Sequence, residues 1–73
     1  MNRRWTAIVE RDGDGYVALC PELDVASQGD SVAEARDNLE EALTLFLETA
    51  SAEEVERRTR SDFYVTHVEV AVG

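Results

Sequence analysis

The chain has 73 residues, with 16 acidic and 7 basic side chains and a formal net charge of −9. A chain this short forms one small domain with a marginal core, so we expect a single domain over residues 1–73 that is stabilised by oligomerisation. The acidic balance argues against direct binding of nucleic acid, because contacts to phosphate need clustered Lys and Arg. It favours solubility or a basic protein partner.

The cysteine and histidine content argues against a domain stabilised by disulfides and against one stabilised by zinc. One cysteine and one histidine can form neither an internal disulfide nor a structural zinc site, so we expect no cofactor and no metal. No apolar run approaches the roughly 20 residues of a membrane span, and no signal peptide is recognisable. We therefore expect a cytoplasmic protein that does not contact a membrane.

Two strand-forming stretches precede the only proline. Residues 4–12 (RWTAIVERD) are rich in strand formers, and residues 13–15 (GDG) tolerate the positive φ that a tight hairpin requires. Residues 16–20 (YVALC) predict the returning strand. Pro21 lacks an amide donor and ends that strand, and a short third strand is expected over residues 24–28.

A capping box begins the clearest element of the sequence. Ser31 can accept a hydrogen bond from the amide of Glu34, whose carboxylate can reach back to the amide of Ser31. Apolar residues then recur at helical spacing, namely Val32, Ala35, Leu39, Ala42, Leu43, Phe46 and Ala50. The opposite side of this helix carries acidic residues: Glu34, Asp37, Glu41 and Glu48.

The rest of the chain predicts a loop and a last strand. Residues 51–62 are polar and charged, which allows one helical turn over residues 53–57, and residues 63–72 (FYVTHVEVAV) are rich in β-branched strand formers. The element order β-β-β-α-β predicts an α+β fold, an antiparallel meander with a fourth strand parallel to the first, in the order 3-2-1-4. One helix covers one face of this sheet, so we expect a second subunit to cover the other face or to pair with the exposed edge.

Two catalytic interpretations and one calcium-binding interpretation are weaker than their structural alternatives. Nothing near Cys20 prepares a thiolate, so a buried strand-end cysteine is expected. Asp12 and Asp14 lack the longer ligand series of a calcium loop and fit a hairpin turn. A two-metal nuclease site would need Glu10, Glu69 and either Glu40 or Glu41 to converge, yet Glu10 and Glu69 need not share a face. The sequence therefore predicts that the protein is not an enzyme.

The assembled pattern resembles the small HicB-like antitoxins of bacterial and archaeal toxin–antitoxin pairs. The resemblance covers residues 5–72 and is carried by the segments DGDGYVALCPELDVASQGDS, VAEARDNLEEALTLFLE and FYVTHVEV. It implies a single HicB-like domain, the β-β-β-α-β half of a ribonuclease H-like sheet without its catalysis. Family members often read Leu-Pro-Gly-Cys in the loop after the proline, where this chain reads LDVA over residues 23–26.

The resemblance also implies a partner, a small basic toxin of the HicA type that cleaves mRNA using a histidine. Inhibition would be steric and electrostatic, because carboxylates would replace phosphates on the RNA-binding surface of the toxin. Many such antitoxins carry a C-terminal DNA-binding segment, and we recognise none here, so we expect no direct binding of DNA. We also expect a homodimer or homotetramer. The candidate contact residues lie on the loops and on the acidic side of the helix: Asp12, Asp14, Glu22, Asp24, Asp37, Glu41, Leu45 and Glu48.

One alternative function stays open at this point. The chain could be a solitary oligomeric binding module of the same fold, with another partner or ligand. A basic reading frame of similar length beside the gene would favour the antitoxin, and its absence would favour the solitary module.

Overall fold

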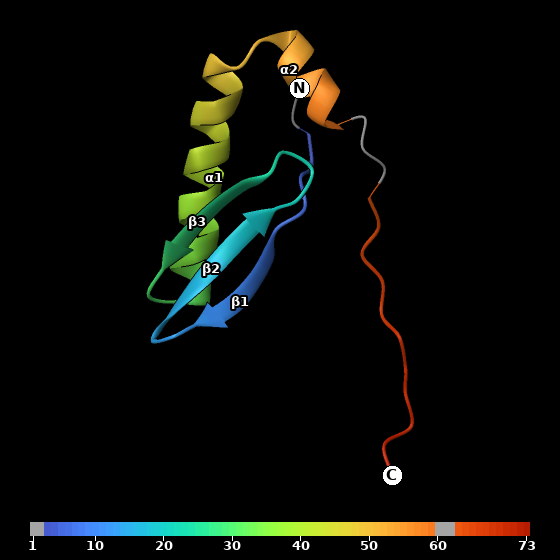
Figure 1. Cartoon of the computed structure of the whole chain (residues 1–73). Coiled ribbons are helices and arrows are strands. Elements are labelled where there is room, and N and C mark those ends of the chain that lie inside the picture. Colours follow the sequence, from blue (N-terminus) through green and yellow to red (C-terminus); the bar gives the residue numbers. More distant parts are fainter. Residues whose placement is uncertain (1–2, 60–62) are drawn as a thin grey trace.

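A computed structural model describes residues 3–59 and 63–73 of the chain. In these residues the three strands form an antiparallel sheet in the order β1-β2-β3, and α1 packs against one of its faces (Figure 1). The α+β class and the three-stranded meander predicted from the sequence are confirmed. The elements in chain order are β1 (Ile8–Asp12), β2 (Gly15–Cys20), β3 (Val25–Gly29), α1 (Val32–Thr49) and α2 (Ala52–Thr59).

Turn chemistry places the two connections of the sheet. Asp12 pairs with Gly15 across a two-residue turn in which Gly13 takes a φ of 61°. Pro21 directly follows the last residue of β2, as predicted. Asp24 takes a φ of 55° before β3 begins, a left-handed conformation that aspartate tolerates better than most side chains. Both short connections therefore use residues suited to positive φ.

At the start of α1, one hydrogen bond of the predicted capping box is present and the other has a different donor. The Glu34 amide donates to Oγ of Ser31 at 3.0 Å, as expected. The Glu34 carboxylate, however, accepts a hydrogen bond of 3.2 Å from the amide of Asp30 and not from that of Ser31. Together these bonds hold the chain as it turns from β3 into α1, so the position of the helix on the sheet is fixed locally.

The core lies between α1 and the face of the sheet that contains Ala18 and Cys20. Its buried members are Ala18, Cys20, Leu23, Ala35, Leu39 and Leu43. Small residues let the helix approach closely, since a Cβ added to Gly29 would lie 2.6 Å from the backbone nitrogen of Ala35. The burial of Cys20 predicted from the sequence is confirmed.

The second helix extends beyond the single turn predicted over residues 53–57. Its capping serine is Ser51, whose Oγ accepts from the Glu54 amide at 3.1 Å. Glu54 also accepts a hydrogen bond of 2.9 Å from Nε of Arg58, four residues along the helix. Ser-x-x-Glu is a capping signature that the sequence contained and that the loop prediction overlooked. Residues 60–62 of the predicted loop lie outside the described residues.

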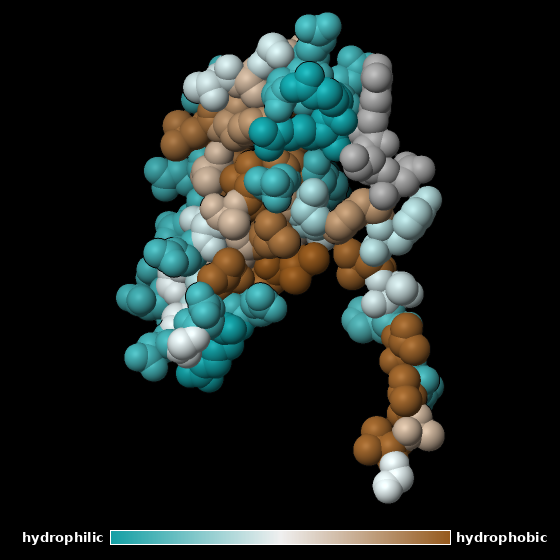
Figure 2. Space-filling view, viewed as in Figure 1, coloured by the Kyte–Doolittle hydropathy of each residue, from teal (hydrophilic) through white to brown (hydrophobic). Residues whose placement is uncertain are grey.

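The predicted fourth strand is absent from the sheet of the described chain. Residues 63–73 are extended, and every one of them is exposed. They run beside the domain as a separate segment (Figure 1), along which apolar side chains stand in solvent (Figure 2). A strand needs a neighbour to pair with, and this segment does not reach β1. The predicted order 3-2-1-4 is not seen in the described chain, whose sheet has the order β1-β2-β3 and leaves β1 with a free edge.

The close approach of α1 to β3 requires a residue without a side chain at position 29, and this requirement can be tested. We expect Gly29→Ala to lower the free energy of unfolding by about 1–3 kcal/mol, because the new methyl group meets backbone atoms of α1 that cannot rotate away. Urea unfolding followed by circular dichroism measures the change. The matched control is Gly13→Asn, which meets no atom within 4 Å and keeps a residue that tolerates positive φ, and should change stability by less than about 0.5 kcal/mol.

Candidate partner-binding surface

The exposed side of α1 is a consequence of how the helix packs. Burial of Ala35, Leu39 and Leu43 turns one side of the helix towards the sheet. Residues at the other positions of the 3.6-residue period face solvent. Among them lies a shallow hollow of about 270 Å³, here called the acidic face, which is lined by Asp37, Glu40, Glu41, Thr44, Leu45 and Glu48.

The acidic face combines negative charge with an exposed apolar side chain. Residues 37, 41, 45 and 48 follow one another at intervals of three or four, which places them in one row about 17 Å long on the helix. Leu45 lies in this row and is 56% exposed. Asp37 is paired with Arg36 at 3.3 Å, but both side chains are exposed, so this ion pair is weak. The surface therefore keeps its negative character.

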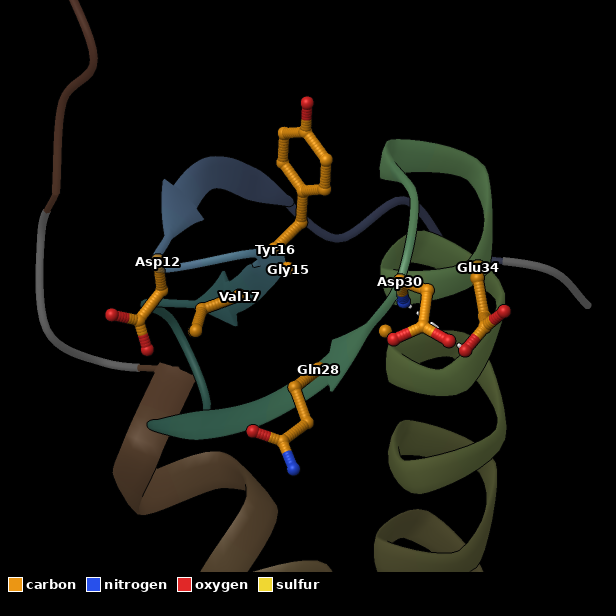
Figure 3. Close-up of a pocket in the computed structure, with 8 residues that line it drawn as sticks. Asp12, Gly15, Tyr16, Val17, Gln28, Asp30 and Glu34 are labelled. Carbon is orange, nitrogen blue, oxygen red and sulfur yellow. Dashed lines mark hydrogen bonds between the residues drawn. The ribbon is translucent and has the colours of Figure 1, made fainter.

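A second hollow of about 380 Å³ lies where the β1–β2 hairpin approaches the start of α1. It is shown in Figure 3 and is lined by Asp12, Gly15, Tyr16, Val17, Gln28, Gly29, Asp30 and Glu34. In Figure 3 the Asp12 side chain comes from the hairpin, whereas Asp30 and Glu34 lie together at the helix start. Glu34 precedes Asp37 by three residues, so carboxylates extend from this hollow onto the acidic face.

The loop residues predicted to bind a partner have separate positions. Asp14 is exposed in the turn of the hairpin, near Asp12 in sequence. Asp24 is exposed in the turn before β3, where its φ of 55° fits its role in the turn. Four predicted residues (Asp37, Glu41, Leu45 and Glu48) thus line one hollow with Glu40, which the prediction had omitted. Asp12, Asp14 and Asp24 lie outside it.

Glu22 is used inside the domain. Its two carboxylate oxygens accept from the Thr6 amide at 3.2 and 3.0 Å, and Oε2 also accepts from the Thr6 hydroxyl at 2.7 Å. Burial is the largest single influence and raises the pKa of Glu22. The hydrogen bonds from Thr6, from the backbone of Glu22 itself and from Cys20 together outweigh burial, so they hold this pKa below its ordinary value. We therefore leave Glu22 out of the contact surface, because its acceptors are already occupied by the N-terminal segment.

Cys20 is a neutral thiol within the same network. Its Sγ donates to Oε1 of Glu22 at 3.6 Å. Burial is the largest influence and raises the pKa of the Cys20 thiol. A backbone hydrogen bond at Leu23 lowers this pKa by less, and the negative charge of Glu22 raises it further. A thiol in this state is a poor nucleophile. In the described ranges, no group of three or more His, Cys, Asp or Glu side chains is arranged to hold a metal ion.

The loop before β3 is also where α2 docks. Nη1 of Arg58 donates a hydrogen bond to the carbonyl of Leu23, and the Arg58 guanidinium lies 4.7 Å from the ring centroid of Phe46. These contacts tie α2 to both the core loop and α1. Neither helix of the described chain has the length and apolar character that crossing a membrane would need.

The Glu22 network predicts a specific dependence of stability on pH. We expect Glu22→Gln to lower the free energy of unfolding by about 1 kcal/mol at neutral pH, because the charged acceptor for Thr6 is lost. A carboxyl with a lowered folded-state pKa contributes stability above its unfolded pKa of about 4.3, and this contribution disappears as the pH falls through the folded-state value. The difference between the two proteins should therefore shrink in acid.

Urea unfolding of both proteins over a pH series measures this difference. Glu10→Gln is the matched control, because it removes the same charge from an exposed side chain on β1 and should change stability by less than about 0.5 kcal/mol. A difference between wild type and Glu22→Gln that stays constant into acid would show that ionisation of Glu22 does not stabilise the fold.

Comparison with known proteins gives the family of the chain. A UPF0150 protein of Helicobacter pylori is 35% identical over 66 residues, which cover 89% of this chain and 92% of the relative. A UPF0150 protein of Synechocystis is 46% identical over 50 residues, which cover 66% of this chain and 69% of the relative. No family model matches the chain, and no solved structure matches it. The identity to the first relative over nearly the whole of both chains shows that the protein belongs to the UPF0150 family.

Proposed function

We propose that the protein is an inhibitor of the antitoxin type, which binds a small basic toxin of the HicA type and covers its RNA-binding surface. The observation that carries the proposal is the acidic face of α1, where carboxylates surround the exposed Leu45. The resemblance of the chain to HicB-like antitoxins supports the same partner. An apolar centre with a charged rim is a common arrangement in protein interfaces.

The physical basis of this binding is competition for one surface. A toxin that cleaves mRNA presents Lys and Arg to phosphate groups, and the carboxylates of the acidic face offer those cations an alternative set of anions. The net charge of −9 adds long-range attraction, which speeds encounter at low salt. Once bound, the domain excludes RNA by its volume, so inhibition needs no chemical step.

The proposal assigns no catalytic role to the chain. The carboxylates of the acidic face are solvent-exposed, and the buried Cys20 is a neutral thiol, so neither set is prepared for catalysis. Since a partner that cleaves mRNA would act in the cytoplasm, the proposal includes a cytoplasmic location for the protein. A single reduced cysteine suits that compartment.

The resemblance further implies a half ribonuclease H-like sheet, which requires a fourth strand beside β1. We propose that residues 63–72 form this strand, parallel to β1, in the assembled protein. Their β-branched composition favours a strand, and their apolar side chains are exposed in the described chain. The free edge of β1 provides a place where such a strand can pair.

The acidic face can be tested by charge reversal at two of its residues. We expect Asp37→Lys with Glu41→Lys to slow association with a HicA-type toxin by about 10-fold or more at low salt, because steering depends on the local field. Both side chains are exposed, so the domain should stay folded by circular dichroism. Stopped-flow mixing with a toxin variant that lacks its catalytic histidine measures the rate, and an RNA-cleavage assay measures inhibition of the active toxin.

The matched control is Glu10→Lys with Glu53→Lys, two exposed positions outside the acidic face. Each reversal adds two charge units, so both double variants have a net charge of −5 instead of −9. An equal effect of the two pairs would show that net charge alone matters. Unchanged association in both variants would argue against electrostatic binding, and a tagged protein that recovers no basic protein from its native cell would favour the solitary binding module.

A further inference from the structure

Residues 63–72 carry an apolar side that the described chain leaves in water. Tyr64, Val68, Val70 and Val72 alternate along this extended segment and are 85%, 81%, 71% and 97% exposed. Side chains at alternate positions of an extended chain lie on the same side. A row of large apolar side chains of this kind is rare on a protein surface unless it contacts another surface.

The domain has a partly apolar groove beside the residues that lead into β1, called here the groove beside β1. It has a volume of about 400 Å³ and lies between α1 and residues 5–7, which lead into β1. Trp5, Leu39, Leu43 and Leu47 supply its apolar walls, and Leu47 is 36% exposed. The groove therefore lies on the side of the sheet that α1 covers, next to the strand whose outer edge is unpaired.

The segment fits the edge and the groove together. Ten extended residues reach about 33 Å, which is longer than β1 and its leading residues combined. Paired along the free edge of β1, the segment would turn alternate side chains towards α1 and the groove. With the row containing Val68 and Val70 turned that way, His67 and Glu69 face solvent on the other side, as charged and polar residues require.

We propose that the strand that fills this place comes from a second copy of the chain, so that residues 63–72 of each copy pair with β1 of the other in a reciprocal exchange. This inference rests on the fourth strand proposed above and names its donor. The homodimer would be symmetric, with each edge and each groove used once. Its two copies both carry a charge of −9, so the backbone ladder and apolar burial must hold them together against charge repulsion.

The course of the chain favours a second copy over the chain's own β1. Arg58 holds the end of α2, the last described element before the segment, to the Leu23 carbonyl and lies against Phe46. Residues 63–73 run apart from their own sheet, as Figure 1 shows, and all of them are exposed. A segment that lies apart from its own edge can reach the identical edge of another copy, the arrangement that domain exchange uses.

Two measurements on the full chain, without any toxin, test the exchange. Light scattering should give twice the 8.1 kDa mass of one chain. An equimolar mixture of isotope-labelled and unlabelled chains, unfolded and refolded together, should show intermolecular nuclear Overhauser effects between the methyl groups of Val68 or Val70 and the side chains of Trp5 or Leu47. A dimer with these contacts supports the proposal.

Other outcomes overturn the proposal in distinguishable ways. A monomer with the same contacts within one molecule would keep the fourth strand and remove the exchange. A monomer without them would remove both. A dimer that lacks contacts between residues 63–72 and the groove would show that another surface joins the copies. Toxin binding is measured separately, so none of these results decides the proposed function.

A pair of charge-matched variants tests the side chains that enter the groove. We expect Val68→Lys with Val70→Lys to halve the apparent mass to that of one chain, because two charged side chains would replace the apolar row in the groove. Glu69→Lys adds the same two units of charge on the opposite side of the segment and should remain a dimer. All three residues are exposed in the described chain, so circular dichroism and urea unfolding should show an intact domain in both variants. A dimer that survives the double valine substitution would overturn the proposal.

Discussion

The close approach of α1 to the sheet is the constraint on which the rest of the domain depends. Gly29 has no side chain where α1 begins, and Ala18 and Ala35 are both fully buried. The helix therefore buries only one narrow side, with the small Ala35 near its start and the larger Leu39 and Leu43 further along. A helix seated in this way leaves its opposite side in solvent, and that side carries the carboxylates around Leu45.

The Glu22 network fixes the N-terminal segment, and it does so near the groove beside β1. Thr6 binds the Glu22 carboxylate through its amide and its hydroxyl. Trp5, the neighbouring residue, forms one wall of the groove against Leu39 and Leu43. Because the carboxylate holds the backbone at Thr6, the tryptophan is positioned before any strand binds. A residue predicted to contact a partner directly thus shapes the place where a second copy is proposed to bind.

The features that the sequence predicted well are those set by neighbours in the chain. Gly13 and Pro21 determine the turns around β2, Ser31 begins α1, and the helical period gathers Asp37 and Glu41 on one side. The second helix was equally local, and Ser51 with Glu54 could have predicted its start. Short-range hydrogen bonds and side-chain periodicity need no knowledge of the tertiary fold, so these parts can be read from residues alone.

The features that the sequence did not predict depend on distant residues or, in the proposed exchange, on a second molecule. The internal use of Glu22 requires Thr6, which is sixteen residues away and carries no signal of its own. Residues 63–72 have the composition of a strand, but composition does not say which edge the strand joins. In the proposed exchange, the edge that this strand joins belongs to a second copy of the chain. That is why the composition predicts a strand where the described chain has a separate segment.

The two proposed associations involve adjacent parts of α1. Glu40 and Thr44 line both the acidic face and the groove beside β1, so a strand seated in the groove lies next to the surface proposed for the toxin. Salt acts on the two events in opposite directions. It screens the repulsion between two copies that each carry −9, which strengthens the exchange, and it weakens the attraction of a basic partner. The exchanged strand would supply apolar and backbone contacts that salt does not screen, whereas the acidic face supplies a field that is strongest when salt is low. In a dimer assembled through β1, apolar and backbone contacts would therefore stabilise the association of the copies. The charges of the acidic faces would remain available to attract the partner.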